Sequence, residues 1–318
     1  MINVSFVVDL SSQSGAGHTV RSSILCDAFN KAGCNVSLVT FGQSVSTQFL
    51  YLYKNIDFCE SLSFKKPDLL VIDNYNFTNA DYRKFKKYAG KVLVLDDLCN
   101  RQIDCDFLWD PSLIREGKHY DNIILDTCAL LLGGEYHIFS DQHIESALNF
   151  RNYTPEILQK IHLYGGHSKV SGLDEIFLGL NNCGHEIQYL TRYGDYGLDI
   201  GIKSQIINFS RNPIVTYQYC RIGVGSPGNM LWERGSVGLP SYILINNSNQ
   251  LKICQTLHEN DYLFLGSENW PADIKGEIGN INSFFFNTDR LEKMSKKLKE
   301  KISLNGKHKI VQHVLEHL

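Results

Sequence analysis

Residues 4–21 read VSFVVDLSSQSGAGHTVR and contain an apolar stretch, a loop of small residues and the start of an amphipathic helix. The apolar residues 4–8 predict a strand, and residues 19–32 predict the helix. In α/β proteins, a strand, a small-residue loop and a helix in this order expose backbone N–H groups to an anionic ligand. His18 stands at the end of the loop, where a side chain that titrates near neutral pH would face a phosphate.

The composition is that of a folded protein long enough for two domains. The chain has 318 residues, 43% of them hydrophobic and 20% charged, and a domain usually holds about 150 residues. A net charge of −3 without a lysine or arginine run excludes the electrostatic pattern of a nucleic-acid or anionic-membrane binder. No apolar run reaches the roughly 20 residues of a membrane span, and Met1 leads straight into a strand-like segment. We therefore expect a cytoplasmic protein without a membrane span.

Nine cysteines are scattered along the chain, and none forms a Cys-x-x-Cys pair. An odd number at irregular spacing supports neither a disulfide framework nor a zinc knuckle. We interpret them as buried free thiols, and we expect no metal and no cofactor.

Short apolar stretches alternate with helical patterns through both halves of the chain. Strands are predicted at residues 4–8, 35–40, 69–73, 92–96, 161–164, 185–191, 206–209, 221–224 and 241–245. Strands separated by helix-length connections are typical of βαβ units on a parallel sheet. The polar, aperiodic residues 140–154 indicate a domain boundary, after which Gly165-Gly166 repeats the strand-to-glycine-turn pattern of the first half.

The predicted fold class is therefore α/β, with two Rossmann-like domains and a ligand cleft between them at the carboxyl ends of the strands. The first domain covers residues 1–145 and carries the His18 loop, and the second covers residues 155–318 and binds the nucleotide. The lysine-rich residues 290–318 predict one or two closing helices, whose lysines form a solvated face.

The first chemical segment is Ser14-Gly15-Ala16-Gly17-His18. Its glycines permit positive φ angles and a close approach of backbone to ligand. The third glycine of the Gly-x-Gly-x-x-Gly dinucleotide motif is missing. From its position alone, His18 serves equally well as a helix cap or as a functional residue.

The second chemical segment, residues 225–234, reads GSPGNMLWER and follows the predicted strand 221–224. Ser226 as N-cap and Pro227 as first helical residue would turn a helix N-terminus toward a ligand. Glu233 lies about two turns further, where a carboxylate would accept hydrogen bonds from both ribose hydroxyls. From spacing alone, a surface glutamate paired with Arg234 or a lysine is the favoured interpretation.

Several short motifs together resemble one known family. They are Asp9-x-Ser-Ser, Gly-x-Gly-His18-x-x-Arg21, Asp73-Asn74-Tyr75, Asp96-Asp97-Leu98, Cys105-Asp106, Gly134-x-Tyr136, Gly165-Gly166 and Trp232-Glu233-Arg234 followed by Gly238-Leu239-Pro240-Ser241. In this order, over roughly residues 1–270, they resemble the UDP-2,4-diacetamido-2,4,6-trideoxy-β-L-altropyranose hydrolases of pseudaminic acid biosynthesis. That family has a GT-B-like fold and is related to the lipid II-forming GlcNAc transferase.

The resemblance implies metal-independent hydrolysis of a UDP-linked amino sugar, in which water attacks the anomeric carbon with inversion. His18 would be the general base and Tyr75 would orient the sugar or the water. Helix N-termini and glycine loops would stabilise the charge on the leaving diphosphate. The expected substrate-binding residues are Gly15, Gly17, Arg21, Gly166, His167, Asn229, Glu233, Asn249 and Gln250.

Three positions depart from the family, because Val7, Ser140 and Ser168 stand where it carries charged residues. A second hypothesis is therefore a GT-B glycosyltransferase with a UDP-sugar or CMP-nonulosonic acid donor, in which His18 activates an acceptor hydroxyl. A third is a non-enzymatic nucleotide-sugar-binding regulator. In each case the partner is a nucleotide sugar, and we expect a monomer.

Two other features have simpler interpretations. Asp104-Cys105-Asp106 has the Asp-x-Asp spacing of metal-dependent glycosyltransferases, but no other hard ligand is near in sequence, so a loop or strand edge is favoured. The histidines without ligand spacing are predicted to be structural: His137, His143, His162, His185 and His258.

Overall fold

The computed structural model describes residues 1–10, 16–39, 53, 56–59, 66–150, 154–155, 158–166, 170–191, 204–208, 212–246 and 250–318. The chain divides into two compact units. Unit 1 contains Met1–Phe139 and Ser303–Leu318, and unit 2 contains Ser140–Ile302. None of the helices in the described ranges combines the length and the hydropathy that crossing a bilayer requires.

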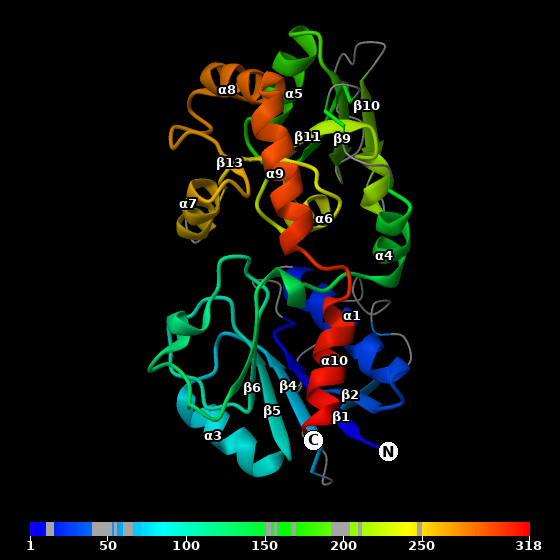
Figure 1. Cartoon of the computed structure of the whole chain (residues 1–318), viewed down its shortest axis with the longest axis vertical. Coiled ribbons are helices and arrows are strands. Elements are labelled where there is room, and N and C mark those ends of the chain that lie inside the picture. Colours follow the sequence, from blue (N-terminus) through cyan, green and yellow to red (C-terminus); the bar gives the residue numbers. More distant parts are fainter. Residues whose placement is uncertain are drawn as a thin grey trace. The chain divides into compact units, whose positions relative to one another are not determined.

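Unit 1 is built on a parallel sheet of strand order β3-β2-β1-β4-β5-β6-β7 (Figure 1). The order reverses between β1 and β4, as in doubly wound nucleotide-binding folds. The strands are β1 Asn3–Val8, β2 Asn35–Val39, β3 Asp57–Cys59, β4 Leu69–Asp73, β5 Lys91–Leu95, β6 Phe107–Asp110 and β7 Ala129–Leu132. The helices are α1 Ala16–Lys31, α3 Asn79–Tyr88 and α10 Gly306–Glu316, with short 3-10 turns η2 Gly117–Tyr120 and η3 Gly134–Tyr136.

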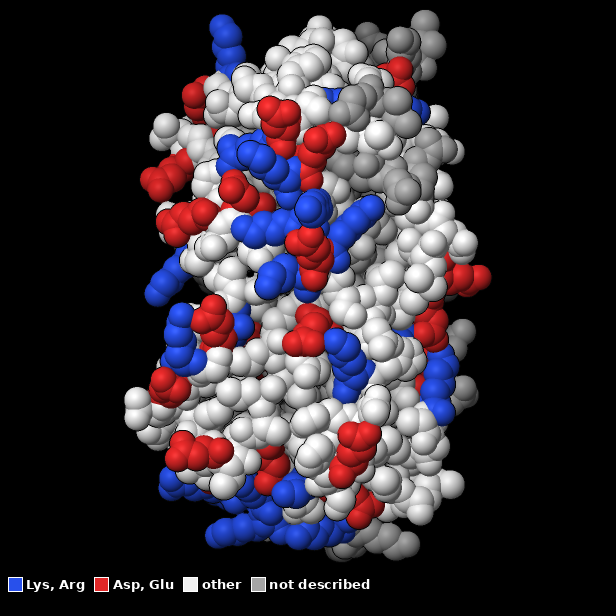
Figure 2. Space-filling view, in the orientation of Figure 1, with Lys and Arg blue, Asp and Glu red and all other residues white. Residues whose placement is uncertain are grey.

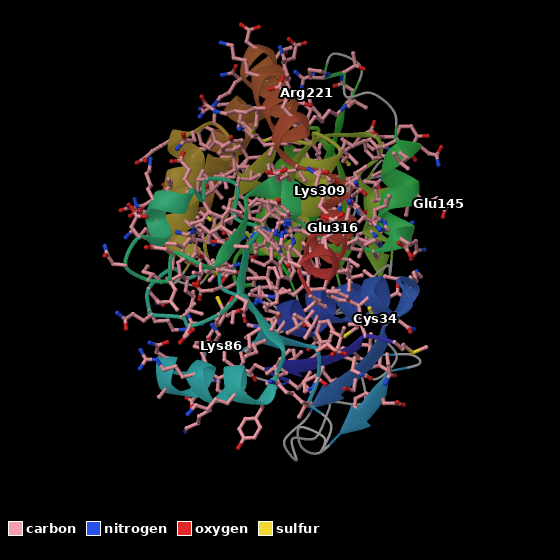
Figure 3. All side chains as sticks on the ribbon, turned by 60° about the horizontal axis from the view of Figure 1, so that its bottom comes forward. Cys34, Lys86, Glu145, Arg221, Lys309 and Glu316 are labelled. Carbon is pink, nitrogen blue, oxygen red and sulfur yellow. The ribbon has the colours of Figure 1, made fainter. Side chains whose placement is uncertain are left out.

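Helices cover both faces of this sheet, which is why its central strands are apolar throughout. Phe6 of β1 packs in one cluster with Phe29 of α1 and Ile310 of α10. Val7 belongs to the opposite cluster, together with Tyr82 of α3. Figure 1 shows α10 beside α1, and Figure 3 labels Lys309 and Glu316 on α10.

Unit 2 repeats the architecture with a parallel sheet of order β10-β9-β8-β11-β12-β13. The strands are β8 Lys160–Tyr164, β9 Glu186–Thr191, β10 Gln205–Asn208, β11 Cys220–Gly225, β12 Ser241–Ile243 and β13 Phe264–Leu265. The helices are α4 Asp141–Leu148, α5 Leu173–Asn182, α6 Asn229–Ser236, α7 Leu251–Glu259, α8 Ile274–Phe286 and α9 Thr288–Lys301, with the 3-10 turn η4 Pro213–Thr216. The strand order reverses between β8 and β11.

A close approach of two strands marks the reversal in unit 2. Gly225 ends β11 at φ 146°, and a Cβ there would lie 1.7 Å from the carbonyl oxygen of Tyr164 in β8. Only glycine fits, because any side chain would collide with rigid backbone. The glycine therefore lets β8 and β11 run side by side to their carboxyl ends.

The helix α9 has one buried and one exposed side. Leu291, Met294 and Leu298 are buried, while Lys293 and Lys296 are exposed. On the face seen in Figure 2, acidic and basic side chains are interspersed around this helix. These two lysines thus lie on an exposed face, as the sequence predicts for residues 290–318, but Lys307 of α10 is buried and does not fit that prediction.

The predicted parallel strands are all present, with ends that differ by no more than two residues. Four strands are not predicted: β3, β6, β7 and β13. Segments of two to four residues are too short to show the alternation of apolar and polar residues that indicates a strand. Residues 140–154, predicted to be irregular, contain α4, whose N-cap Ser140 accepts a hydrogen bond from the His143 backbone N–H at 3.1 Å.

The predicted domain limits also need correction. The division falls at Phe139–Ser140, and residues 303–318 return to unit 1 instead of completing the second domain. The physical reason is the apolar side of α10, since Ile310, Val311 and Val314 are buried in the unit 1 core.

Candidate active site

Four neighbouring strands of unit 1 carry an aspartate at their carboxyl ends. Asp9 directly follows β1, Asp73 ends β4, Asp96 directly follows β5, and Asp110 ends β6. All four are buried. The reversal between β1 and β4 is the place where sheets of this type bind ligands, so Asp73 lies at the expected position for a functional residue.

Asp73 holds three residues of the first turns of α1. His18 Nδ1 lies 2.6 Å from Asp73 Oδ1, and Arg21 donates from Nε to Oδ2 at 2.7 Å and from Nη2 to Oδ1 at 2.5 Å. Ser22 donates its hydroxyl proton to Oδ2 at 3.0 Å. Positions 18, 21 and 22 share one side of a helix, so the spacing His-x-x-Arg-Ser turns all three toward the end of β4.

The ionised state of Asp73 decides which ring nitrogen of His18 carries the proton that it donates. Burial alone would raise the pKa of Asp73, but the charge and hydrogen bonds of Arg21, helped by His18, hold it well below its ordinary value. Asp73 is therefore an ionised acceptor, and His18 donates to it from Nδ1. Arg21 Nη2 also lies 3.1 Å from this nitrogen, but it donates to Asp73 and Tyr75. In the neutral imidazole, Nε2 is then the acceptor.

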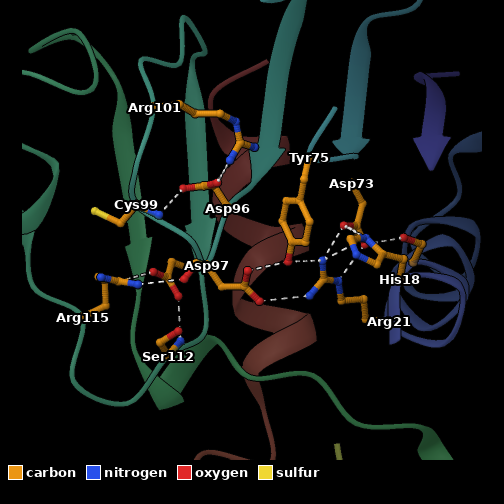
Figure 4. A network of polar contacts seen from close by, with 12 residues as sticks. His18, Arg21, Asp73, Tyr75, Asp96, Asp97, Cys99, Arg101, Ser112 and Arg115 are labelled. Carbon is orange, nitrogen blue, oxygen red and sulfur yellow. Dashed lines mark hydrogen bonds and ion pairs between the residues drawn. The ribbon is translucent and has the colours of Figure 1, made fainter. Parts of the chain in front are cut away.

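Tyr75, two residues after β4, completes the centre of the site (Figure 4). Its ring meets the His18 ring edge to face, with centroids 4.7 Å apart. Its hydroxyl accepts a hydrogen bond from Arg21 Nη2 at 3.1 Å and donates one to Asp97 Oδ1. Arg21 Nη1 lies 3.2 Å from Asp97 Oδ2. Arg21 thus joins the histidine–aspartate pair to the tyrosine–aspartate pair.

Two of the other aspartates, Asp96 and Asp110, hold the loops that follow β5 and β6. Asp96 pairs with Arg101 at 2.6 Å and Asp110 pairs with Arg115 at 2.5 Å. Burial raises the pKa of both carboxyl groups although the arginines oppose it. Arg115 also donates to the backbone oxygen of Asp97 at 2.8 Å. These contacts fix the loop from which Asp97 reaches Tyr75.

In unit 2, the carboxyl ends of β8 and β11 carry the predicted glycine turn and helix N-terminus. The helix starts two residues later than predicted, because Gly228 is the N-cap of α6 and Asn229 is its first residue. Ser226 does not cap it, since its hydroxyl donates to the Gly165 backbone oxygen and accepts from Asn246. Gly166 adopts φ 104° beside Ser226.

Glu233 and Arg234 lie on α6 in different surroundings. Glu233 is half-buried, and burial raises its pKa to about 7 although Arg234 opposes the shift. Arg234 is fully buried and donates to Nδ1 of His162 from Nη2 at 2.9 Å. His162 therefore carries its proton on Nε2, 2.9 Å from the Thr216 hydroxyl, which itself donates to a backbone oxygen. The predicted pairing of Glu233 with Arg234 is thus replaced by an Arg234–His162 contact.

The structure places the predicted site residues in two groups. His18, Arg21 and Tyr75 come together in unit 1, where Gly17 also lies in the first turn of α1. Gly166, Asn229, Glu233 and Gln250 belong to unit 2, with Gln250 as the N-cap of α7. Gly15, His167, Ser168 and Asn249 lie outside the described residues.

The prediction assigns no role to Asp73 or Asp97, which hold His18 and Tyr75. A signal for Asp73 exists in the sequence, because an aspartate follows the apolar runs FVV, LLVI, VLVL and FLW directly. Acidic residues repeated at the ends of buried parallel strands indicate the ligand edge of the sheet. Asp97 has no comparable signal, since its contact with Tyr75 depends on the course of a loop.

Asp104 and Asp106 lie just before β6 and face Lys86, with nitrogen–oxygen distances of 3.0 and 3.7 Å. The loop position agrees with the prediction. In the part of the chain that the structure describes, no three His, Cys, Asp or Glu side chains are grouped so as to hold a metal ion.

His143, His162 and His185 make hydrogen bonds inside unit 2, to Ser236, Thr216 and Asn282.

No protein-family model and no curated sequence matches the chain. Solved structures do match over nearly the whole chain. MurG of Acinetobacter baumannii superposes with a TM-score of 0.71 at 10% identity, covering 99% of this chain and 100% of that one. Phytolacca americana UGT2 complexed with UDP-2fluoro-glucose and pterostilbene gives 0.68 at 10% identity, covering 94% of both chains. UDP-GlcNAc 2-epimerase of Neisseria meningitidis bound to UDP-GlcNAc gives 0.59 at 12% identity, covering 99% of both. With its two parallel-sheet units, the chain has the GT-B fold.

Proposed function

We propose that this protein is an enzyme that hydrolyses a UDP-linked amino sugar, releasing UDP by water attack at the anomeric carbon with inversion. The observation that carries the proposal is the Asp73–His18 pair, in which an ionised carboxylate orients the imidazole and leaves Nε2 as a base. The sugar class comes from the family that the sequence motifs resemble. UDP-sugar complexes among the GT-B structures support the nucleotide.

In the proposed reaction, Nε2 of His18 removes a proton from water as the water oxygen bonds to the anomeric carbon. The bond from that carbon to the UDP oxygen breaks at the same time, and the products are free sugar and UDP. Asp73 stabilises the imidazolium that forms. The N-terminus of α6 and Glu233 in unit 2 are proposed to bind the diphosphate and the ribose. UDP is already a good leaving group, so no metal ion is required in this proposal.

The test is UDP release from UDP-amino sugars without an acceptor, with and without EDTA. We expect His18→Gln to lower kcat by about 10²–10⁴-fold, because a general base contributes that much. Asp73→Asn should give a comparable loss, since the amide cannot stabilise an imidazolium. His308→Gln is the matched control, because His308 is an exposed histidine of the same unit. Undiminished UDP release by His18→Gln would exclude the proposal.

A glycosyltransferase remains the second candidate, and the sequence departures from the hydrolase family favour it. Two of these departures have a local explanation, because Val7 lies in the sheet core and Ser140 caps α4. In a transferase, His18 would deprotonate an acceptor hydroxyl. UDP release that rises only when an acceptor is added would identify this reaction, and EDTA-insensitive release without acceptor would identify hydrolysis.

A further inference from the structure

The hydroxyl of Tyr75 belongs to a closed set of contacts with Asp97 and Arg21 (Figure 4). It donates to Asp97 Oδ1 and accepts from Arg21 Nη2 at 3.1 Å. Arg21 Nη1 also donates to the second oxygen of Asp97 at 3.2 Å. Each of the three side chains thus contacts the other two.

This arrangement determines where the tyrosine proton points. Arginine has no acceptor, and a carboxylate has no proton to give, so the phenol must be the donor to Asp97. Burial, assisted by the Asp97 charge, raises the pKa of Tyr75, and the phenol therefore keeps its proton. With the O–H directed at Asp97 and one lone pair directed at Arg21, the Tyr75 oxygen presents only an acceptor lone pair to a ligand.

Like Tyr75, His18 presents a hydrogen-bond acceptor to a ligand. Its Nδ1–H is directed at Asp73, so Nε2 is an acceptor. The two rings are in contact, and Nη2 of Arg21, which donates to the Tyr75 oxygen, lies 3.1 Å from Nδ1 of His18. The centre of the site therefore presents two acceptors and, from these two rings, no donor.

We propose that Asp97 is a positioning residue that fixes Tyr75 as a hydrogen-bond acceptor and thereby selects water over an alcohol as the nucleophile. This inference rests on the proposed function. Water has two O–H groups, one for His18 Nε2 and one for the Tyr75 oxygen, and its lone pairs stay free to attack carbon. An alcohol has one O–H, which His18 takes, and the second lone pair of Tyr75, the one that Arg21 does not occupy, then lacks a donor. The hydrogen bond to this lone pair, which water makes and the alcohol does not, favours water by about tenfold.

Asp97→Asn should reverse the selection. Arg21 Nη1 donates toward Asp97 Oδ2, so the amide oxygen of asparagine takes that place and its NH₂ group faces Tyr75. Tyr75 then accepts from the amide and turns its own proton toward the ligand. One donor beside one acceptor fits an alcohol, which both donates and accepts.

The experiment is hydrolysis of a UDP-amino sugar in buffer containing methanol, with free sugar and methyl glycoside quantified by NMR. We expect Asp97→Asn to lower total UDP release and to raise the glycoside-to-sugar ratio about tenfold over the wild type. Tyr75→Phe removes the acceptor without supplying a donor, so its ratio should fall between the two. Asp104→Asn is the matched control, because Asp104 is a partly exposed, ion-paired aspartate of the same unit. It should change neither rate nor ratio.

The outcomes separate the two proposals. A slower Asp97→Asn enzyme with an unchanged ratio means a structural role and overturns the inference alone. UDP release that survives His18→Gln overturns the proposed function. A second measurement needs no turnover: the phenol proton that Tyr75 donates to Asp97 should give a distinct low-field NMR resonance. We expect this resonance in the wild type and not in Tyr75→Phe or Asp97→Asn. Its absence in the wild type would also overturn the assigned role of Asp97.

Discussion

At the scale of residues, the chemistry of the site depends on which side chains donate hydrogen bonds and which accept them. Asp73 receives hydrogen bonds from three residues of α1, and one of them, Arg21, also reaches Tyr75 and Asp97. Arg21 was expected to bind substrate, yet four of its five N–H groups are used inside the site. Its main effect is to keep the Asp73 carboxylate ionised beside His18 and to join Asp73 to Tyr75 and Asp97.

The proposed ribose contact of Glu233 predicts a pH dependence of nucleotide binding. Burial raises the pKa of Glu233 to about 7, so the side chain is neutral below that pH and ionised above it. Hydrogen bonds to a charged acceptor are about twice as strong as neutral ones. We therefore expect the Kd of UDP to fall about fivefold between roughly pH 6 and pH 8, beyond the change caused by the phosphate itself.

Calorimetry with UDP and 2′-deoxy-UDP isolates this effect, because both carry the same diphosphate. The extra tightening should shrink with the deoxynucleotide, which keeps only the 3′-hydroxyl, and should vanish in Glu233→Gln. The same raised pKa disfavours the ionised form in the folded state. Hence the free energy of unfolding should decrease as pH rises from about 4.3, the ordinary glutamate value, to about 7. A Kd ratio of the two nucleotides that is independent of pH would exclude the assigned ribose contact.

At the scale of elements, β11 and α6 depend on a glycine that leaves room for a buried cation. Arg234 of α6 is fully buried and lies across Gly223 of β11. A Cβ at position 223 would lie 2.5–2.8 Å from Cδ, Nε and Cζ of Arg234. The guanidinium cannot move freely, because it is held by His162 Nδ1 and the Val224 backbone oxygen.

Gly223→Ala should therefore destabilise unit 2 by about 1–3 kcal/mol, the usual effect of overpacking a core. The matched control is Gly279→Ala in α8, where a Cβ would meet no atom within 4 Å. In a helix that change should stabilise by up to about 1 kcal/mol. Chemical denaturation monitored by tryptophan fluorescence measures both. Equal stability of the two variants would show that Arg234 can move away from a Cβ at position 223 without lowering the free energy of unfolding.

At the scale of the whole molecule, the chain leaves unit 1 at Phe139 and returns to it at Ser303. The last helix, α10, packs beside α1, which carries His18. The backbone N–H of Ser303 bonds to Gly134 at 3.1 Å, and Lys309 pairs with Glu135 at 2.9 Å. The C-terminal helix thus supports the unit that holds the proposed base.

Ile310→Ala should weaken unit 1 and leave unit 2 unaffected. Ile310 is fully buried against the β1 and α1 side of the sheet, and removing such a side chain typically costs about 2–5 kcal/mol. Hydrogen exchange followed by mass spectrometry should show faster exchange in β1, α1 and β4. Ile281→Ala, at an equally buried position of α8, should have the converse effect in unit 2. Loss of protection in both units from either substitution would mean that they unfold as one.

The sequence by itself determined the parallel α/β architecture, because buried central strands must be apolar on both faces and glycine must follow them where backbones approach. It also pointed to His18, Arg21 and Tyr75, through a loop motif and a family resemblance. Only the tertiary structure decided that Asp73 and Asp97 hold them, that Arg234 faces His162 and not Glu233, and that residues 303–318 belong to the first unit. These contacts join residues far apart in the chain, and local patterns of hydrophobicity carry no information about which distant side chains meet.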